Sequence, residues 1–247
     1  MTTTTRTHEA RSVRRTQMDP LRRTALIVGV LFVITYITSI AAKFGFYAPL
    51  ADNPDYIVNG EQDTRVLWGA LAEMLLIVAN IGSAVALYPV VRRRFPMTSL
   101  GFVTARVMES VFIGVGVLAV LTIVTMRQDF AGVDNAALAT VGGALTTLWE
   151  WTFILGPGFV VGIGNGMLLG YMMWRSGLVP RGLAALGLVG GPLIVLAGAA
   201  MVMGVVEEGS SLQMLTAMPE FFWELLFGLY LIVKGFRPSP VTAETRD

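Results

Sequence analysis

The sequence predicts an all-α membrane protein: a bundle of six transmembrane helices with both termini in the cytoplasm and short helices at the outer interface. The prediction depends on a low charged fraction, long apolar runs and a one-sided distribution of basic residues. Of 247 residues, 54% are hydrophobic and 14% are charged, whereas soluble domains average about 25% charged residues. Because the charges cluster between long apolar runs, we expect the chain to have the lipid bilayer as its main partner.

Six apolar runs reach the length of about 20 residues that a helix needs to cross a bilayer. They are Thr24–Ala42, Val66–Val91, Leu100–Met126, Glu150–Trp174, Gly182–Val206 and Pro219–Phe236. The first run is longer than the apolar core of an ordinary signal peptide, which favours a membrane span. The predicted organisation is a disordered basic tail at 1–23, a transmembrane domain at 24–236 and a second tail at 237–247.

Basic residues lie mostly on one side of the predicted bundle. The two tails with the adjoining Lys234, the segment 92–99 and the segment 175–181 together hold 14 of the 18 lysines and arginines. The alternate loops carry mainly aspartate and glutamate. Basic loops remain in the cytoplasm of membrane proteins, so both termini are predicted to be cytoplasmic, and a bacterial inner membrane is the expected location.

Two apolar stretches are expected to form separate helices at the outer interface. Asp134–Leu148 has a helical pattern, but joining it to the fourth span would give a helix of about 40 residues, which is more than a bilayer needs. Met214–Met218 is the second such stretch, with Pro219 at the first position of the last span. Glu150 and Glu220 are then expected at helix N-termini in the headgroup region, where they complement the helix dipole without further function.

A stripe of glycines at every fourth position marks the fourth span, and this spacing places them along one face of a helix. The members are Gly158, Gly162, Gly166 and Gly170. Small residues let helix backbones approach closely in lipid, where burial of apolar faces gives little stabilisation. Packing inside the bundle is the leading interpretation. Formation of a homo-oligomer and a groove for a ligand or lipid tail stay open as alternatives.

Ionisable groups inside the spans form the candidate site. A charge at mid-bilayer costs at least about 2.5–3.5 kcal/mol, so these groups should be paired, neutral or hydrated. Arg106 and Glu109 are three residues apart and can pair on one helix, and Asn80 is expected to reach the Arg106 guanidinium. Glu73 and Glu224 complete one polar layer, which would bind a proton or a small-molecule ligand or would hold the helices together.

Several kinds of chemistry are excluded by composition. The chain has no cysteine, its one histidine, His8, lies in the polar tail, and both lysines are at helix ends. These facts exclude thiolate metal sites, haem ligation by histidine and a Ser-His-Asp triad within the membrane. No catalytic motif is recognised, so we expect no enzymatic activity, no cofactor, no metal and no nucleic-acid partner.

Four segments resemble the bacterial multi-pass family called domain of unknown function 4386. They are "ALYPVVRRR" (Ala86–Arg94), "ARVMES" (Ala105–Ser110), "LLGYMMWRSGLVPRGLAALG" (Leu168–Gly187) and "ELLFGLYLIVKG" (Glu224–Gly235). The resemblance covers roughly 21–237 and implies an integral inner-membrane helical protein without naming a reaction. Arg106 and Glu109 match the Arg-x-x-Glu of the family, and Glu73 and Glu224 match its acidic positions in the second and last spans. The family often has a histidine at the start of the fourth span, which "WEWTF" lacks.

Two functions remain open from the sequence. One is a small-molecule or ion permease, or a ligand-binding membrane protein, that uses the polar layer as its site. The other is a non-catalytic scaffold or accessory subunit whose buried charges are structural. A cavity that reaches Glu73 and Glu224 from outside would favour the first function, and a dry, fully paired layer would favour the second.

Overall fold

A computed structural model describes residues 18–53, 55–130 and 134–243, and this part of the chain is helical with no strand. Six helical runs are long and apolar enough to cross a membrane, as predicted. They are α1 with η1 (Pro20–Phe46), α4 (Asp63–Val91), α5 (Pro96–Asp129), the run from α6 to α7 (Asn135–Ser176), α8 (Arg181–Val202) and α9 (Ser211–Val233). Short helices α2 (Ala48–Ala51), α3 (Tyr56–Asn59) and α10 (Pro240–Ala243) lie outside the spans.

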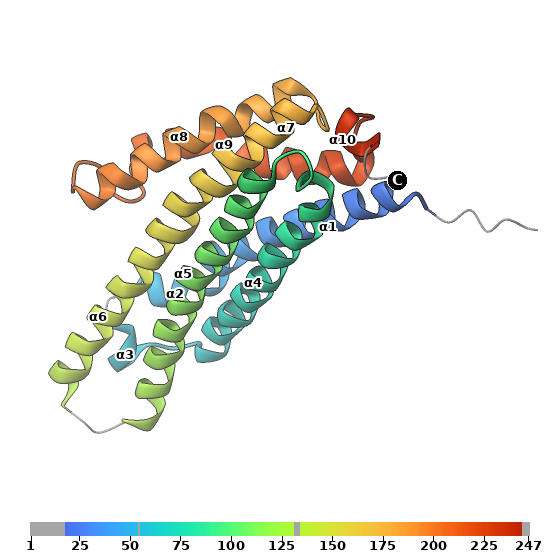
Figure 1. The fold of residues 1–247 in the computed structure, drawn as a ribbon. Helices are drawn as coiled ribbons and strands as arrows, with labels where there is room; N and C mark the ends of the chain where they lie inside the picture. Colours follow the sequence, from blue (N-terminus) through green and yellow to red (C-terminus); the bar gives the residue numbers. More distant parts are fainter. Residues whose placement is uncertain (1–17, 54, 131–133, 244–247) are drawn as a thin grey trace, which may run out of the picture.

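The six spans form a closed ring. Helix α1 packs on α4, α4 on α5, α5 on the fourth span, that span on α8, α8 on α9, and α9 back on α1. The start of α1 and the end of α9 lie near each other (Figure 1), and we call their side of the molecule the tail side. The opposite side, where α1 ends and α9 begins, is called the loop side. That the tail side is cytoplasmic stays a prediction.

The fourth span differs from its prediction. Asp134–Leu148 does not form a separate interfacial helix, because α6 (Asn135–Phe153) continues through η2 (Ile154–Val160) and η3 (Gly162–Leu169) into α7 (Gly170–Ser176). The whole run has 42 residues, about 60 Å of helix, against a bilayer core of about 30 Å. Helix α5, with 34 residues, is also longer than the core requires.

Tertiary contacts explain why these long helices do not stop at the membrane surface. A loop-side core joins α5, α6 and the short helices α2 and α3, with Tyr47, Ile57, Ile123 and Trp149 among its buried side chains. Gly142 of α6 lies directly against the Ile57 side chain. The length argument failed because it assumed that a helix outside the bilayer core has nothing to pack against.

The last span also begins earlier than predicted. Helix α9 starts at Ser211, where the Ser210 hydroxyl accepts a hydrogen bond from the Gln213 amide. Met214–Met218 is therefore part of α9 and not a separate helix, and Pro219 lies inside it. Proline is tolerated within membrane helices when neighbours satisfy the freed backbone groups. Because α9 begins earlier than predicted, Glu220 lies in its third turn and not at a helix terminus.

Three of the four stripe glycines pack against α8, which fits the leading interpretation. A Cβ on Gly162 would lie 2.7 Å from the Gly191 carbonyl oxygen, one on Gly166 would lie 2.7 Å from the Gly191 amide nitrogen, and one on Gly170 would lie 3.1 Å from the Leu188 amide nitrogen. The distances at Gly162 and Gly166 are too short for an added side chain, and the distance at Gly170 would require α8 to move by a few tenths of an ångström. Gly158 differs, since its Cβ would meet only the Phe153 carbonyl oxygen, at 3.5 Å. Gly162, Gly166 and Gly170 thus face α8 and do not form a free surface for a homo-oligomer.

Basic residues hold the ends of helices on the tail side. Helix α1 begins at Pro20, four residues before the expected span, and Arg22 donates hydrogen bonds to the carbonyl oxygens of Leu231 and Ile232 at the end of α9. Carbonyl oxygens in the last turn of a helix lack some of their helical partners, and the Leu231 oxygen also accepts from the Gly235 amide at 3.1 Å. The C-terminal segment returns to the bundle, where the Arg237 amide donates to the Leu178 carbonyl at 2.8 Å.

We predict that the loop side faces away from the cytoplasm. The chain has no cysteine, so one introduced thiol gives an unambiguous signal. Asn59→Cys, on the exposed end of α3, should react in intact cells with a membrane-impermeant maleimide. Met97→Cys, 78% exposed at the tail-side start of α5, should react only after permeabilisation. The reverse labelling pattern would invert the topology.

We also predict that Gly162→Ala lowers the free energy of unfolding by about 1–3 kcal/mol, because the new methyl group collides with α8. The matched control is Gly143→Ala in α6, where an added Cβ meets nothing within 4 Å. That change should be neutral or stabilise by up to about 1 kcal/mol, because alanine favours the helix. Denaturant titration of the purified protein measures both values. Equal effects at the two sites would show that the stripe has no packing role.

Candidate functional site

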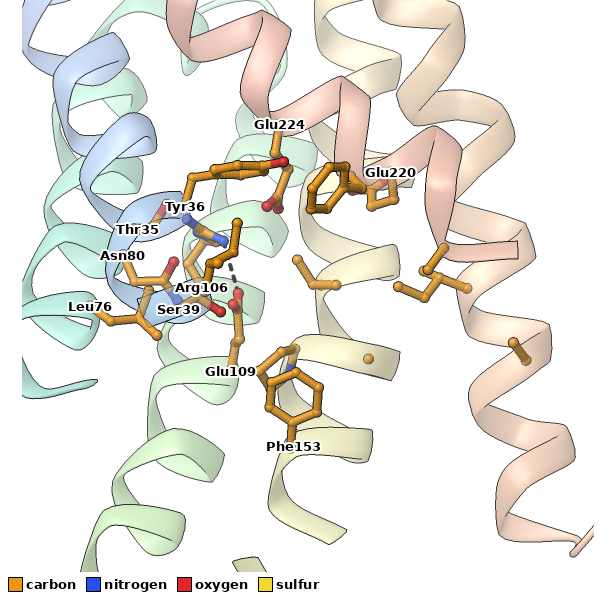
Figure 2. A pocket seen from close by; sticks show the side chains of 18 of the residues that line it. Thr35, Tyr36, Ser39, Leu76, Asn80, Arg106, Glu109, Phe153, Glu220 and Glu224 are labelled. Atoms are coloured by element: carbon orange, nitrogen blue, oxygen red, sulfur yellow. Dashed lines mark hydrogen bonds and ion pairs between the residues drawn. The ribbon is translucent and has the colours of Figure 1, made fainter. Parts of the chain in front are cut away.

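A cavity of about 210 Å³ lies inside the ring, and every one of the six spans contributes to its lining. We call it the central cavity. Figure 2 shows its polar side chains converging from several helices. The polar residues of the lining are Thr35, Tyr36, Ser39, Asn80, Arg106, Glu109, Gln213, Glu220 and Glu224. The lining extends to Ile40, Met201 and Gln213 at the loop-side ends of α1, α8 and α9, so the cavity runs from mid-bundle toward the loop side.

Arg106 carries the positive charge at the tail-side end of this cavity and is only 2% exposed. The predicted ion pair is present: Nη1 of Arg106 donates to Oε2 of Glu109 at 2.9 Å, one turn further along α5 (Figure 2). The guanidinium also lies 5.3 Å from the ring centre of Phe32, within cation–π range. Nε and Nη2 of Arg106 have no hydrogen-bond partner among the described residues.

Glu224 reaches the cavity from α9 and is held by an amide on the fourth span. Nδ2 of Asn165 donates a hydrogen bond to Oε1 of Glu224, and the Asn165 carbonyl oxygen accepts one from the Trp223 indole at 2.9 Å. Asn165 is fully buried. These bonds tie α9 to η3 next to the cavity.

Glu220 is the second acidic side chain that α9 brings to the cavity, and its expected place in the headgroup region was wrong. It is 3% exposed, and neither of its carboxylate oxygens has a hydrogen-bond partner among the described residues. A Cβ on Gly166 would lie 2.7 Å from Oε2 of Glu220, and one on Gly190 would lie 2.9 Å from it. The missing side chains of these two glycines provide the space in which the carboxylate lies.

Glu73 does not join the other charges. It is 8% exposed and accepts a hydrogen bond at 2.9 Å from the hydroxyl of Tyr47, in the loop-side core. Burial, followed by the adjacent Glu73 carboxylate, raises the pKa of the Tyr47 phenol, which keeps the hydroxyl protonated as the donor. Glu73 is not part of the cavity lining. The predicted single layer is thus divided into the cavity cluster and a separate Tyr47–Glu73 pair.

Asn80 lies in the lining but was expected to contact a different group. Its amide nitrogen donates to the Ser110 hydroxyl at 3.3 Å, and its carbonyl oxygen has no partner among the described residues. Asn80 therefore does not hydrogen-bond to the Arg106 guanidinium. Its fully buried position places one more free acceptor at the cavity wall.

The loop-side end of the cavity has an ionic contact beside it. Nζ of Lys43, in η1, lies 2.5 Å from Oε1 of Glu208 in the α8–α9 loop and 3.5 Å from the ring centre of Phe153, a lining residue. Both ionic side chains are partly exposed, so the net stabilisation should be at most about 1 kcal/mol. The contact joins η1, α6 and the α8–α9 loop at this end of the lining.

Sequence reasoning missed Glu220, Asn165 and Tyr47 as participants. Glu220 is four residues before Glu224 and so shares its helix face, which was a usable signal. Asn165 was visible as an amide inside an apolar run between two glycines, a setting in which polar side chains are usually functional. No local signal pointed to Tyr47, because its partner Glu73 is 26 residues away.

Six apolar spans around a polar cavity define an integral multi-pass membrane protein. The chain belongs to the family described as domain of unknown function (DUF4386), whose model matches residues 27–235, and the resemblance noted in the sequence is confirmed. No curated protein and no solved structure matches the chain.

We predict that the Arg106–Glu109 pair affects stability as a unit. Glu109→Leu leaves a buried guanidinium without its partner and should lower the free energy of unfolding by about 3–5 kcal/mol. Adding Arg106→Met should recover most of that loss, because replacing a whole buried pair with apolar groups is often neutral. Denaturant titration measures both. Lys43→Met, which breaks the exposed pair, is the control and should cost at most about 1 kcal/mol. Equal losses in the single and double variants would contradict the prediction.

Proposed function

We propose that the protein is a small-molecule permease or ligand-binding membrane protein. Its ligand enters from the loop side and binds in the central cavity. The observation that supports this most is the free hydrogen-bonding capacity of two charged cavity residues. Arg106 and Glu220 are almost fully buried, yet two nitrogens of the first and both oxygens of the second have no partner among the described residues. Buried polar groups without partners are rare in proteins, and a functional role or a bound water or ion is the usual explanation.

The backbone around the cavity also supports a ligand site. The fourth span is a π-helix over Ile154–Val160 and again over Gly162–Leu169, and the first of these segments contributes Pro157 and Gly158 to the lining. π-helical turns are rare and occur frequently at functional sites. Such turns weaken the regular helix, so their presence beside a polar cavity is more consistent with a binding role than with a purely structural one.

A scaffold or accessory subunit is the second candidate, and it is supported by the contacts that are satisfied. Glu109, Glu224 and Glu73 each have a partner on a neighbouring turn or helix. If the charges only hold the helices together, the cavity should bind nothing. The two functions therefore predict different results in one binding experiment.

We predict that at least one small polar metabolite raises the melting temperature of the purified protein. Binding at 100 times the Kd stabilises the folded state by about 2.7 kcal/mol. Ala217→Phe, which fills the cavity from α9, should abolish the shift, whereas Ala199→Phe, on the exposed face of α8, should retain it. A thermal-shift screen in detergent identifies the compound, and its uptake into proteoliposomes separates a permease from a receptor. A screen without a hit, or a hit that Ala217→Phe leaves unchanged, would favour the scaffold.

A further inference from the structure

The free edge of the Arg106 guanidinium indicates one half of the ligand. Nη1 donates to Glu109, while Nε and Nη2 have no hydrogen-bond partner in the part of the chain that the structure describes. Those two nitrogens form one side of the planar guanidinium and donate in parallel, the geometry that binds a carboxylate or phosphate through two hydrogen bonds. Because the side chain is 2% exposed, an anion bound there would be largely removed from water. The cavity wall therefore holds two unused donors on its one arginine, although acidic residues outnumber that arginine in the lining.

Glu220 indicates the other half. Neither of its oxygens has a hydrogen-bond partner among the described residues, and its side chain lines the same cavity as Arg106. A carboxylate buried to this extent is stabilised by a cationic donor, and the other cavity carboxylates already accept hydrogen bonds from Arg106 and Asn165. The group that could bind an anion, Arg106, and the group that could bind a cation, Glu220, are thus two different residues in the lining of one small cavity.

We infer that the ligand is a small zwitterion with an apolar body, whose anionic group binds the Nε–Nη2 edge of Arg106 and whose ammonium group binds Glu220. This inference rests on the proposed function and specifies its substrate class. Ile194, Ala197 and Met201 supply apolar surface for the body of the ligand. Size agrees: a cavity of about 150 Å³ can hold benzene, so about 210 Å³ accommodates a molecule of amino-acid size.

Two sources provide this chemistry: a free amino acid and the headgroup of an ethanolamine phospholipid. Both join an ammonium to an anionic group through a short linker, and phosphate fits the guanidinium edge as well as carboxylate does. The probes are chosen to distinguish them. They are leucine, 3-methylbutylamine (leucine without its carboxylate), 4-methylpentanoate (leucine without its ammonium) and glycerophosphoethanolamine.

The experiment measures the affinity of each probe for the full-length protein in nanodiscs by calorimetry. A hydrogen bond to a charged group contributes about 1.5–3 kcal/mol, so each missing group should weaken binding about 10- to 100-fold relative to a zwitterion. Tighter binding of leucine indicates a free amino acid, and tighter binding of glycerophosphoethanolamine indicates a lipid headgroup. Both outcomes support the zwitterion site. This comparison uses the unmodified protein, so no variant has to fold.

Glu220→Gln then tests the ammonium site directly. It should weaken binding of both zwitterions about 10- to 100-fold and leave 4-methylpentanoate within about twofold. The control is Glu207→Gln, which removes the same charge from an exposed position in the α8–α9 loop and should change no affinity. The inference is wrong if a single-charge analogue binds as tightly as the zwitterions, or if Glu220→Gln weakens all probes equally.

Failure of this inference can be distinguished from failure of the proposed function. If none of the four probes binds, but a compound that is not a zwitterion binds and is excluded by Ala217→Phe, the cavity is a ligand site and the zwitterion assignment is wrong. If no compound depends on Ala217, both are wrong. If the zwitterions bind and Ala217→Phe excludes them, both are supported.

Discussion

The buried charge of Arg106 is the constraint on which the rest of the bundle depends. An arginine does not lose its proton in a protein, and its position inside the spans removes it from bulk water. Glu109, one turn away, supplies the counter-charge, and the Phe32 ring covers one face of the guanidinium. Six helices in a ring enclose this pair, and each contributes to the cavity around it. The ring therefore provides a polar interior to which all six spans contribute.

Glycine packing and the acidic cluster are two parts of one arrangement. Gly162 and Gly166 bring the fourth span close to Gly191 of α8, and Gly190 brings α8 close to the α9 backbone at Glu220. Close approach of three backbones leaves room for the Glu220 carboxylate, because no side chain of Gly166 or Gly190 occupies that space. The feature that is the strongest packing signal in the sequence is thus also the reason that a carboxylate can be buried beside the cavity.

The sequence predicted what depends on local pattern and missed what depends on tertiary contact. Apolar runs predicted six spans, and three-residue spacing predicted the Arg106–Glu109 pair; both are present. The length of the fourth span could not be predicted, because the contacts of α6 with α3 and α5 continue it past the membrane boundary. The position of Glu220 was missed for a related reason: Pro219 was interpreted as a helix start, although the cap at Ser210 begins α9 two turns earlier.

The two groups of buried carboxylates have different partners, and this difference assigns them different roles. Glu73 is paired with a tyrosine inside an apolar core, where it joins α4 to the segment after α1 and faces no cavity. Glu109, Glu220 and Glu224 face the cavity, and only Glu220 among them has both oxygens free. If the charges were present for cohesion alone, Glu220 should be paired as the others are, since an unpaired buried carboxylate costs stability and gains nothing. Its unpartnered oxygens and the unpartnered nitrogens of Arg106 line the same cavity, and a ligand that binds both groups explains them more simply.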